Sequence, residues 1–327
     1  MILSYALRLV CLGLASFFVL NLVLSLVTRF FAHSGIRLAE GKEASIAARF
    51  LLLLRLFPAA AAGLFVLGLC VPSYLWLEPS ARSEKVGIVC LGLGLFGLAS
   101  CSLSALRGAR AIVLSLLHNH RCGSHGTKFG VAAESSPLLV VSQDAPLLAL
   151  SGLLRPRLLV SLNVLETLSS EELEGALLHE RAHRGSHDNF KRLLLLLAPD
   201  AFPFVSTLNL LEVPWAKFTE WAADDRATAG NQHRAAALAS ALVRVARMGS
   251  ASRLPFLATA LLAGDCELSA RVERLLRVTN SIPTQPARLR RYLRIFVGLL
   301  VPAALTTVLV ATPALAYVHD LLELLVR

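Results

Sequence analysis

The stretch His179-Glu180-Arg181-Ala182-His183 predicts both a helix and a metal site within this chain of 327 residues. Two histidines four residues apart lie on one face of an α-helix, close enough to bind a single tetrahedral Zn²⁺. The glutamate between them can reach a water molecule on the metal and act as a general base. We therefore expect His179 and His183 to be metal ligands and Glu180 to be the catalytic base of a zinc peptidase.

The residues before this motif indicate where its helix begins. Ser169 and Glu172 have the spacing of a capping box, in which each side chain binds the backbone N–H of the other residue. Leu173 and Leu177 then continue an apolar stripe at helical spacing, and Gly185 is a plausible end. The motif is thus expected in the last two turns of a helix.

A second acidic motif supplies what the first lacks. A catalytic zinc site needs a third protein ligand and one open position. Residues 220–224 read Glu-Trp-Ala-Ala-Asp, between Pro214, which can begin a helix, and Gly230, which can end one. Glu220 is the predicted third ligand. Asp224 lies one turn further on the same face and is predicted to accept a hydrogen bond from a ligating histidine.

Other zinc patterns fit less well. A metzincin has glycine three residues after the second histidine and a third ligand three residues later, but here these positions hold Ser186 and Asn189. Asp188 is an alternative third ligand, although we expect it to cap the next helix or to brace the loop below the metal. The six cysteines form no Cys-x-x-Cys pair, so the sequence indicates neither a thiolate zinc site nor a disulfide framework.

The composition is that of a membrane protein. The chain is 55% hydrophobic and 17% charged, with a mean hydropathy of +0.64. Its apolar runs cover residues of about 3–27, 56–77, 86–106 and 295–318, and each is long enough to cross a bilayer as a helix. The first run has no basic segment before it and no clear cleavage site, so we expect a retained helix and not a signal peptide. We predict four transmembrane helices.

The stretch from Leu193 to Leu211 is also apolar, but Pro199, Asp200 and Pro203 interrupt it. It fits a re-entrant or interfacial segment, or the buried partner of the zinc helix. We favour the buried partner.

The basic residues orient the predicted helices. They gather between the first two runs, directly after the third and before the fourth, which places these segments in the cytoplasm. Residues 1–106 then hold three membrane helices with the N-terminus outside, residues 107–292 form a cytoplasmic peptidase domain, and residues 293–327 hold the last helix and a short tail outside. The net charge of +10 follows from these membrane flanks, so we expect a lipid bilayer as partner and no nucleic acid.

The cytoplasmic region is predicted to be a small, mainly helical α/β domain. Residues 137–142 and 156–161 are short apolar runs bounded by turn residues and are predicted strands, with a loop or bulged hairpin at 149–154. Helices are expected at 233–248 and 268–278. A sheet edge beside the zinc helix would let a peptide substrate bind as an added strand.

From Ala149 to Asp225 the chain resembles the BlaR/MecR-type antirepressor metallopeptidases of bacterial membranes. The stretches that carry the resemblance are residues 151–160, 168–173, 179–183, 188–189, 220–225 and 267–276. The resemblance implies a zincin-type membrane metallopeptidase with one Zn²⁺ per chain, held by His179, His183 and Glu220, and with Glu180 as base. HtpX/Ste24-like membrane peptidases share both motifs and are the second family considered.

The resemblance also implies an activity. It predicts a multi-pass protein of the bacterial inner membrane, a gluzincin-type endopeptidase that cleaves a protein substrate, such as a transcriptional repressor, at the cytoplasmic face. The chain ends at Arg327 without the family's β-lactam-sensing domain, so antibiotic recognition is not expected.

Three points stay open at this stage. A quality-control peptidase is one alternative function, and a non-catalytic membrane scaffold with a retained zinc site is another, although a structural zinc site needs no Glu180. Arg271 and Arg226 are candidates for stabilising the oxyanion, with salt bridges the favoured role for both. The sequence indicates no oligomeric state.

Overall fold

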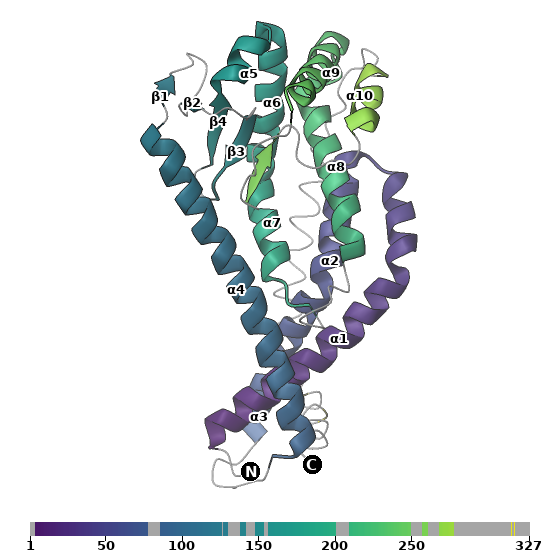
Figure 1. Ribbon diagram of the computed structural model, residues 1–327. Coiled ribbons are helices and arrows are strands. Elements are labelled where there is room, and N and C mark those ends of the chain that lie inside the picture. The colour runs from purple at the N-terminus through teal and green to yellow at the C-terminus, as the bar shows by residue number, and fades with distance from the viewer. Residues whose placement is uncertain are drawn as a thin grey trace.

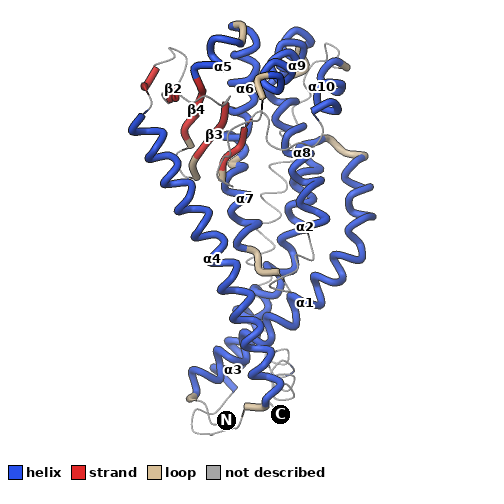
Figure 2. The backbone as a smooth tube through the Cα atoms, in the orientation of Figure 1, coloured by secondary structure: helices blue, strands red, loops and turns tan. Residues whose placement is uncertain are grey.

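Three long apolar helices form the narrow end of the molecule, and a small sheet with further helices forms its wide end (Figure 1). The computed structural model describes residues 4–77, 86–125, 127–129, 138–141, 148–153, 156–200, 209–249, 257–260 and 268–277, together with 315 and 317. The structure is mostly helical, as Figure 2 shows, and the N-terminus lies at the narrow end.

The long helices are long and apolar enough to cross a bilayer. They are α1 (Tyr5–Glu40), α2 (Ala44–Phe65), which continues through a π-helical turn (Val66–Cys70) into α3 (Val71–Leu77), and α4 (Ile88–His125). The predicted spans of about 3–27, 56–77 and 86–106 therefore mark only parts of longer helices.

The predicted fourth span, 295–318, lies outside the described residues apart from 315 and 317. Within it, the Leu315 carbonyl oxygen accepts a hydrogen bond of 2.9 Å from the Ser73 hydroxyl of α3. This contact places Leu315 beside the end of the second long helix.

The helices extend beyond their apolar runs because a second packing surface continues along them. The segment between the first two apolar runs is almost entirely helical, and only Gly41, Lys42 and Glu43 separate α1 from α2. On either side of this turn, a strip of buried alanines lets α1 and α2 approach each other closely and pack against α8 (Asn209–Thr228). The buried residues of this cluster are Ala32, Ala39, Ala44, Ala47, Ala48, Leu51, Leu52, Leu195, Leu211, Trp215, Phe218 and Ala222.

The turn after α7 (Asp188–Leu197) binds all three long helices. The Asn21 amide of α1 donates to the Pro199 carbonyl oxygen at 3.1 Å. The Asp200 carboxylate, 3% exposed, binds Arg55 of α2 at 2.9 Å and Arg107 of α4 at 3.0 Å. A buried carboxylate is stable here because two guanidinium groups compensate its charge.

The outcome for residues 193–211 combines both alternatives. Leu193 and Leu195 are buried, and α7 packs between α4 and α2, as the predicted buried partner would. The following turn nevertheless reaches in among the long helices, which is closer to the re-entrant alternative. Residues 201–208 lie outside the described part of the chain.

The sheet has five strands in the order β1-β2-β4-β3-β5. They are β1 (Thr127–Phe129), β2 (Leu138–Val141), β3 (Leu148–Ser151), β4 (Arg157–Ser161) and β5 (Ala258–Ala260). The strands β2 and β4 are parallel, and the other pairs are antiparallel. Of the loop or bulged hairpin expected at 149–154, the hairpin is closer to the structure, because residues 148–151 form the strand β3, which pairs antiparallel with the next strand, β4.

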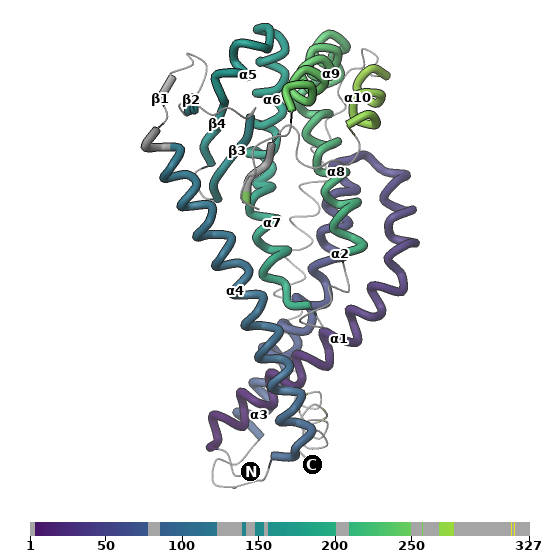
Figure 3. The backbone as a smooth tube through the Cα atoms, in the orientation of Figure 1, coloured from purple at the N-terminus to yellow at the C-terminus, as the bar shows by residue number. Residues whose placement is uncertain are grey.

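Both faces of the sheet are covered. The remaining helices are α5 (Leu162–Thr167), α6 (Ser170–Ser186), α9 (Gln232–Arg247) and α10 (Leu268–Leu276). One face packs on α6 and α9 through Val140, Leu158 and Val160, and the other packs on the end of α4 through Cys122. Figure 3 shows that α6, α7 and α8 lie between α4 on one side and the α1–α2 hairpin on the other.

Candidate metal centre

The helix α6 begins as its sequence predicts and ends later than predicted. Ser169 is the N-cap, its hydroxyl accepts from the Glu172 N–H at 3.3 Å, and the Glu172 carboxylate accepts from the Ser169 N–H at 2.8 Å. The helix continues past Gly185 to Ser186, and the chain reverses at His187, which has φ 56° and ψ 41°. This left-handed backbone conformation is uncommon for a residue other than glycine. It starts α7 at once and returns Asp188 toward the end of α6.

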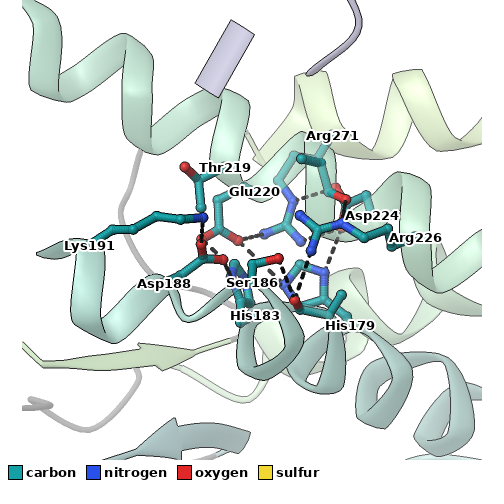
Figure 4. Close-up of polar contacts among 12 residues, drawn as sticks. His179, His183, Ser186, Asp188, Lys191, Thr219, Glu220, Asp224, Arg226 and Arg271 are labelled. Carbon is teal, nitrogen blue, oxygen red and sulfur yellow. Dashed lines mark hydrogen bonds and ion pairs between the residues drawn. The ribbon is translucent and has the colours of Figure 1, made fainter. Parts of the chain in front are cut away.

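Three predicted ligands converge between α6 and α8 (Figure 4). One ligand atom of each of His179, His183 and Glu220 lies within 4.8 Å of the others. The two histidine Nε2 atoms are 3.1 Å apart, and the Glu220 oxygens lie 3.4 Å from Nε2 of His179 and 3.6 Å from Nε2 of His183. Ligand atoms about 2.0–2.1 Å from a tetrahedral Zn²⁺ lie roughly 3.3–3.4 Å from one another, so these separations suit that ion.

The opposite nitrogen of each histidine faces a carboxylate. Nδ1 of His179 lies 2.8 Å from Asp224, and Nδ1 of His183 is hydrogen-bonded to Asp188 at 2.8 Å. A carboxylate partner holds the proton on Nδ1, which leaves a lone pair on each Nε2. Two lone pairs and a carboxylate that face one another repel unless a proton or a metal cation lies between them. The donor set therefore fits a divalent metal that accepts nitrogen and oxygen ligands.

Asp188 does not cap the next helix, because His187 is the N-cap of α7, and the Asp188 carboxylate contacts the ring of His183. Its Oδ2 atom contacts Nδ1 of His183, on the side of the ring opposite the converging Nε2 atoms. Its Oδ1 atom accepts a hydrogen bond of 2.6 Å from the Lys191 amine, a partner that was not predicted from the sequence. The i, i+3 spacing of Asp188 and Lys191 at the start of a helix is the signal that could have indicated the pair.

Glu180 has the environment of a general base. Its side chain is 0% exposed, on the same helix as the two histidines. Burial raises the pKa of the Glu180 carboxyl to about 7. A pKa near the operating pH suits a group that takes up a proton and later gives it back.

Arg271 of α10 binds two of the acidic groups. Its guanidinium donates to both Asp224 oxygens at 2.8 and 2.9 Å, and its Nη1 atom lies 3.3 Å from Glu220. Burial alone would raise the pKa of both carboxyls. Arg271 instead lowers the pKa of Asp224. His183, then His179 and Arg271, lower the pKa of Glu220 well below its usual value. Arg271 thus has the salt-bridging role favoured from the sequence.

Arg226, the second oxyanion candidate, binds the protein backbone. Its guanidinium donates to the carbonyl oxygens of Ala182 and Ala222 at 2.9 Å each. These bonds link the end of α6 to α8, the two helices that carry the candidate metal ligands.

Comparison with known families identifies this part of the chain. Residues 132–275 match the family described as BlaR1 peptidase M56, which confirms the resemblance to BlaR/MecR-type peptidases. The matched residues include both motifs and the arginine helix α10. No curated protein matches the chain at a significant level.

Proposed function

Because residues 132–275 have the pattern of the BlaR1 peptidase M56 family, a membrane metallopeptidase family, we propose that this protein is a zinc endopeptidase of the gluzincin type. The observation that carries the proposal is the convergence of two histidine Nε2 atoms and one carboxylate beside the buried Glu180. A structural zinc site uses four protein ligands and needs no base. Three ligands with an adjacent base are typical of a catalytic site.

The proposed roles follow from these contacts. His179, His183 and Glu220 would hold one Zn²⁺, which when bound polarises the scissile carbonyl and makes water more acidic. Glu180 would take the proton from the attacking water and pass it to the leaving amine. Asp224 would keep the ring of His179 oriented toward the metal, and carboxylate partners of this kind typically matter 10–100-fold for metal affinity or activity.

We also propose that the peptidase faces the cytoplasm of a bacterial cell with its long helices in the inner membrane. The turn between α1 and α2 and the end of α4 lie at the wide end of the molecule, on the same side as the sheet. The basic residues Arg37, Lys42 and Arg49 lie in or near this turn, which favours a cytoplasmic location for that side. A protein substrate, for example a transcriptional repressor, would then be cleaved there.

The decisive experiment replaces Glu180 by Gln in the full-length protein. The change keeps the shape of the side chain and leaves all three proposed ligands in place, so bound zinc should stay near one per chain. Cleavage of labelled casein should fall by roughly 10²–10⁴-fold, the usual contribution of a general base. Glu171→Gln, the same chemical change at a 66% exposed position of α6, is the matched control.

Two outcomes of this experiment separate the alternatives. A Glu180→Gln protein that cleaves casein and supports cells like the wild type, where a deletion does not, would favour the scaffold. Loss of cleavage with retained zinc supports the peptidase. A repressor gene next to this one would then favour a signalling role over HtpX/Ste24-like quality control.

A further inference from the structure

The three long helices change from apolar to charged toward the wide end of the molecule. Arg8, which is 6% exposed, is the only charged residue within their apolar stretches. These stretches are residues 5–28, 56–77 and 88–106. Toward the wide end each stretch is bounded by an arginine, namely Arg29, Arg55 and Arg107. Asp200 binds Arg55 at 2.9 Å and Arg107 at 3.0 Å, so these three charges lie at one level and mark the peptidase-side border of the apolar region.

The opposite border lies one bilayer thickness away. Trp76, near the end of α3, is 61% exposed, and exposed tryptophan is typical of the interface between membrane and water. Positions 55 and 76 are 21 residues apart on continuous helix, roughly 30 Å at the usual rise per residue. This length equals the thickness of the hydrocarbon core of a bilayer. The peptidase-side border is therefore the place where the hydrocarbon core ends.

Two helices give the height of the candidate metal centre above this border. Glu212 of α8 binds Arg55 at 2.9 Å, and Glu220 follows eight residues later, about 12 Å along the helix. Asp200 lies at the border, and the ten residues of α7 that lead from it to Asp188 add about 15 Å. Both helices run along the long axis of the molecule (Figure 1). The centre is therefore held about 12–15 Å above the hydrocarbon core.

This height is short in terms of a peptide chain. The headgroups of one leaflet fill roughly 5–7 Å of it. An extended chain advances about 3.3 Å per residue, so a chain that leaves the hydrocarbon core reaches the centre after about four to six residues. A peptide bond so close to the membrane belongs to the segment that joins a membrane helix to the domain after it.

A cavity of about 410 Å³ gives such a segment room beside the centre. Asp188, which contacts His183, and Thr219, the neighbour of Glu220, both line the cavity. Its opposite wall is formed by the first two turns of α2, the helix that enters the bilayer at Arg55. The lining residues from α6, and one from α8, have small side chains that leave space for a main chain: Ala182, Gly185, Ser186 and Ala222.

We infer that the substrates of this site are proteins anchored in the same membrane, which are cut about four to six residues from the point where their chain leaves the hydrocarbon core. The inference rests on the proposed peptidase function and on the proposed position of the long helices in the bilayer. Anchoring also raises the local concentration of a substrate at the site without any new contact. A soluble protein has neither advantage.

The test varies the height of one scissile bond above the membrane. A casein segment of roughly ten residues, which the protein cleaves in detergent, joins a single membrane helix to a folded fluorescent protein. This substrate is placed in phosphatidylcholine liposomes with the full-length, zinc-loaded protein, and release of the fluorescent protein is measured. Two further versions carry a spacer of roughly 20 residues before the casein segment, either a semi-rigid helix of Glu-Ala-Ala-Ala-Lys repeats or a flexible Gly-Ser chain.

The spacers should have opposite effects although their lengths in residues are equal. The helical spacer lifts the bond by about 30 Å and should slow release at least about tenfold relative to the version without a spacer. The flexible spacer can fold back to the membrane and should keep release within about threefold. Mass spectrometry of the version without a spacer should locate the cut about four to six residues from its membrane helix.

The outcomes separate this inference from the proposed function. Equal release from the two spacer versions would overturn the inference, as would cleavage of an unanchored casein fusion at the anchored rate. Either result would favour a soluble substrate, such as a repressor, and leave the peptidase function intact. Release that persists in Glu180→Gln, or no cleavage of casein in detergent, would reject the proposed function and the inference with it.

Discussion

Replacing Arg271 by Gln tests whether the acidic groups around the metal centre depend on a single cation. Arg271 is 6% exposed and donates two hydrogen bonds to Asp224, which is 1% exposed, while also lying 3.3 Å from Glu220. Removing its charge leaves the buried Asp224 without its main cationic partner and takes one of its cationic neighbours from the buried Glu220. Breaking a buried ion pair from one side costs about 3–5 kcal/mol.

The next turn of the same helix provides a matched control. Arg274 binds Asp225, the neighbour of Asp224 on α8, at 2.6 Å, but the two side chains are 32% and 43% exposed. Solvent screens such a pair, so Arg274→Gln should cost at most about 1 kcal/mol. The two substitutions make the same chemical change on the same two helices and differ mainly in burial.

Urea-dependent pulse proteolysis of the full-length protein in mild detergent measures both variants. The loss for Arg271→Gln should be largest in the metal-free protein and smaller with zinc, because a bound cation supplies positive charge beside Glu220. In a double-mutant cycle, adding Asp224→Asn should recover part of the loss, since the stranded charge is then gone. Equal losses for the two arginine variants, or no dependence on zinc, would refute the argument.

Three further predictions concern the metal and the membrane. Glu220→Ala and His183→Ala should each remove most of the zinc from purified protein, as measured by mass spectrometry; full occupancy of the Glu220 variant would assign the third ligand to another side chain. Burial lowers the pKa of His183, but Glu220 raises it, to about 10 in the metal-free protein. Zinc must therefore displace a proton from His183. The affinity for zinc should rise about tenfold per pH unit between roughly pH 6.5 and 10. The same sign predicts that His183 stabilises the metal-free protein fully below pH 6.5 and loses this contribution as the pH rises through 10; pH-independent zinc affinity would contradict both statements. Reporter fusions after Arg110 or Gly249 should report the cytoplasm and one at Arg327 the outside, whereas a cytoplasmic Arg327 would show that the spans are miscounted.

The two candidate histidine ligands could be predicted to lie together because their geometry is local. Two histidines at i and i+4 share a face of any α-helix, and the capping box of Ser169 and Glu172 marks where that helix begins. That Glu220 faces these histidines follows from no local rule and depends on the packing of α6 against α8. Its prediction came from the known combination of the two motifs in zinc peptidases.

The contacts that support the candidate ligands were harder to predict. Arg271 lies 47 residues from Asp224 in the sequence, and several arginines were equally plausible partners. Asp188 reaches His183 only because His187 adopts a left-handed conformation, which its residue type does not favour. Such positions are determined by tertiary packing and leave little signal in a single sequence.

The lengths of the membrane helices were also underestimated for a physical reason. Hydropathy reports the part of a helix that faces lipid, and it falls where basic residues begin. Alanine is only weakly apolar, so the alanine strip from Ala32 to Ala48 did not appear as a buried surface. It is nevertheless the surface through which α1 and α2 contact α8.

The turn after α7, which contains Asp200, joins the peptidase region to the long helices so closely that the two cannot be separated. A soluble fragment of residues 107–292 would lose Arg55, which binds both Asp200 and Glu212 in the full-length protein. It would also uncover Trp215 and the apolar face around it. We expect such a fragment to aggregate, and exchange of the proposed peptidase region between relatives to succeed only when the α1–α2 hairpin is exchanged with it. The α1–α2 hairpin and the helices of the candidate site should therefore evolve together.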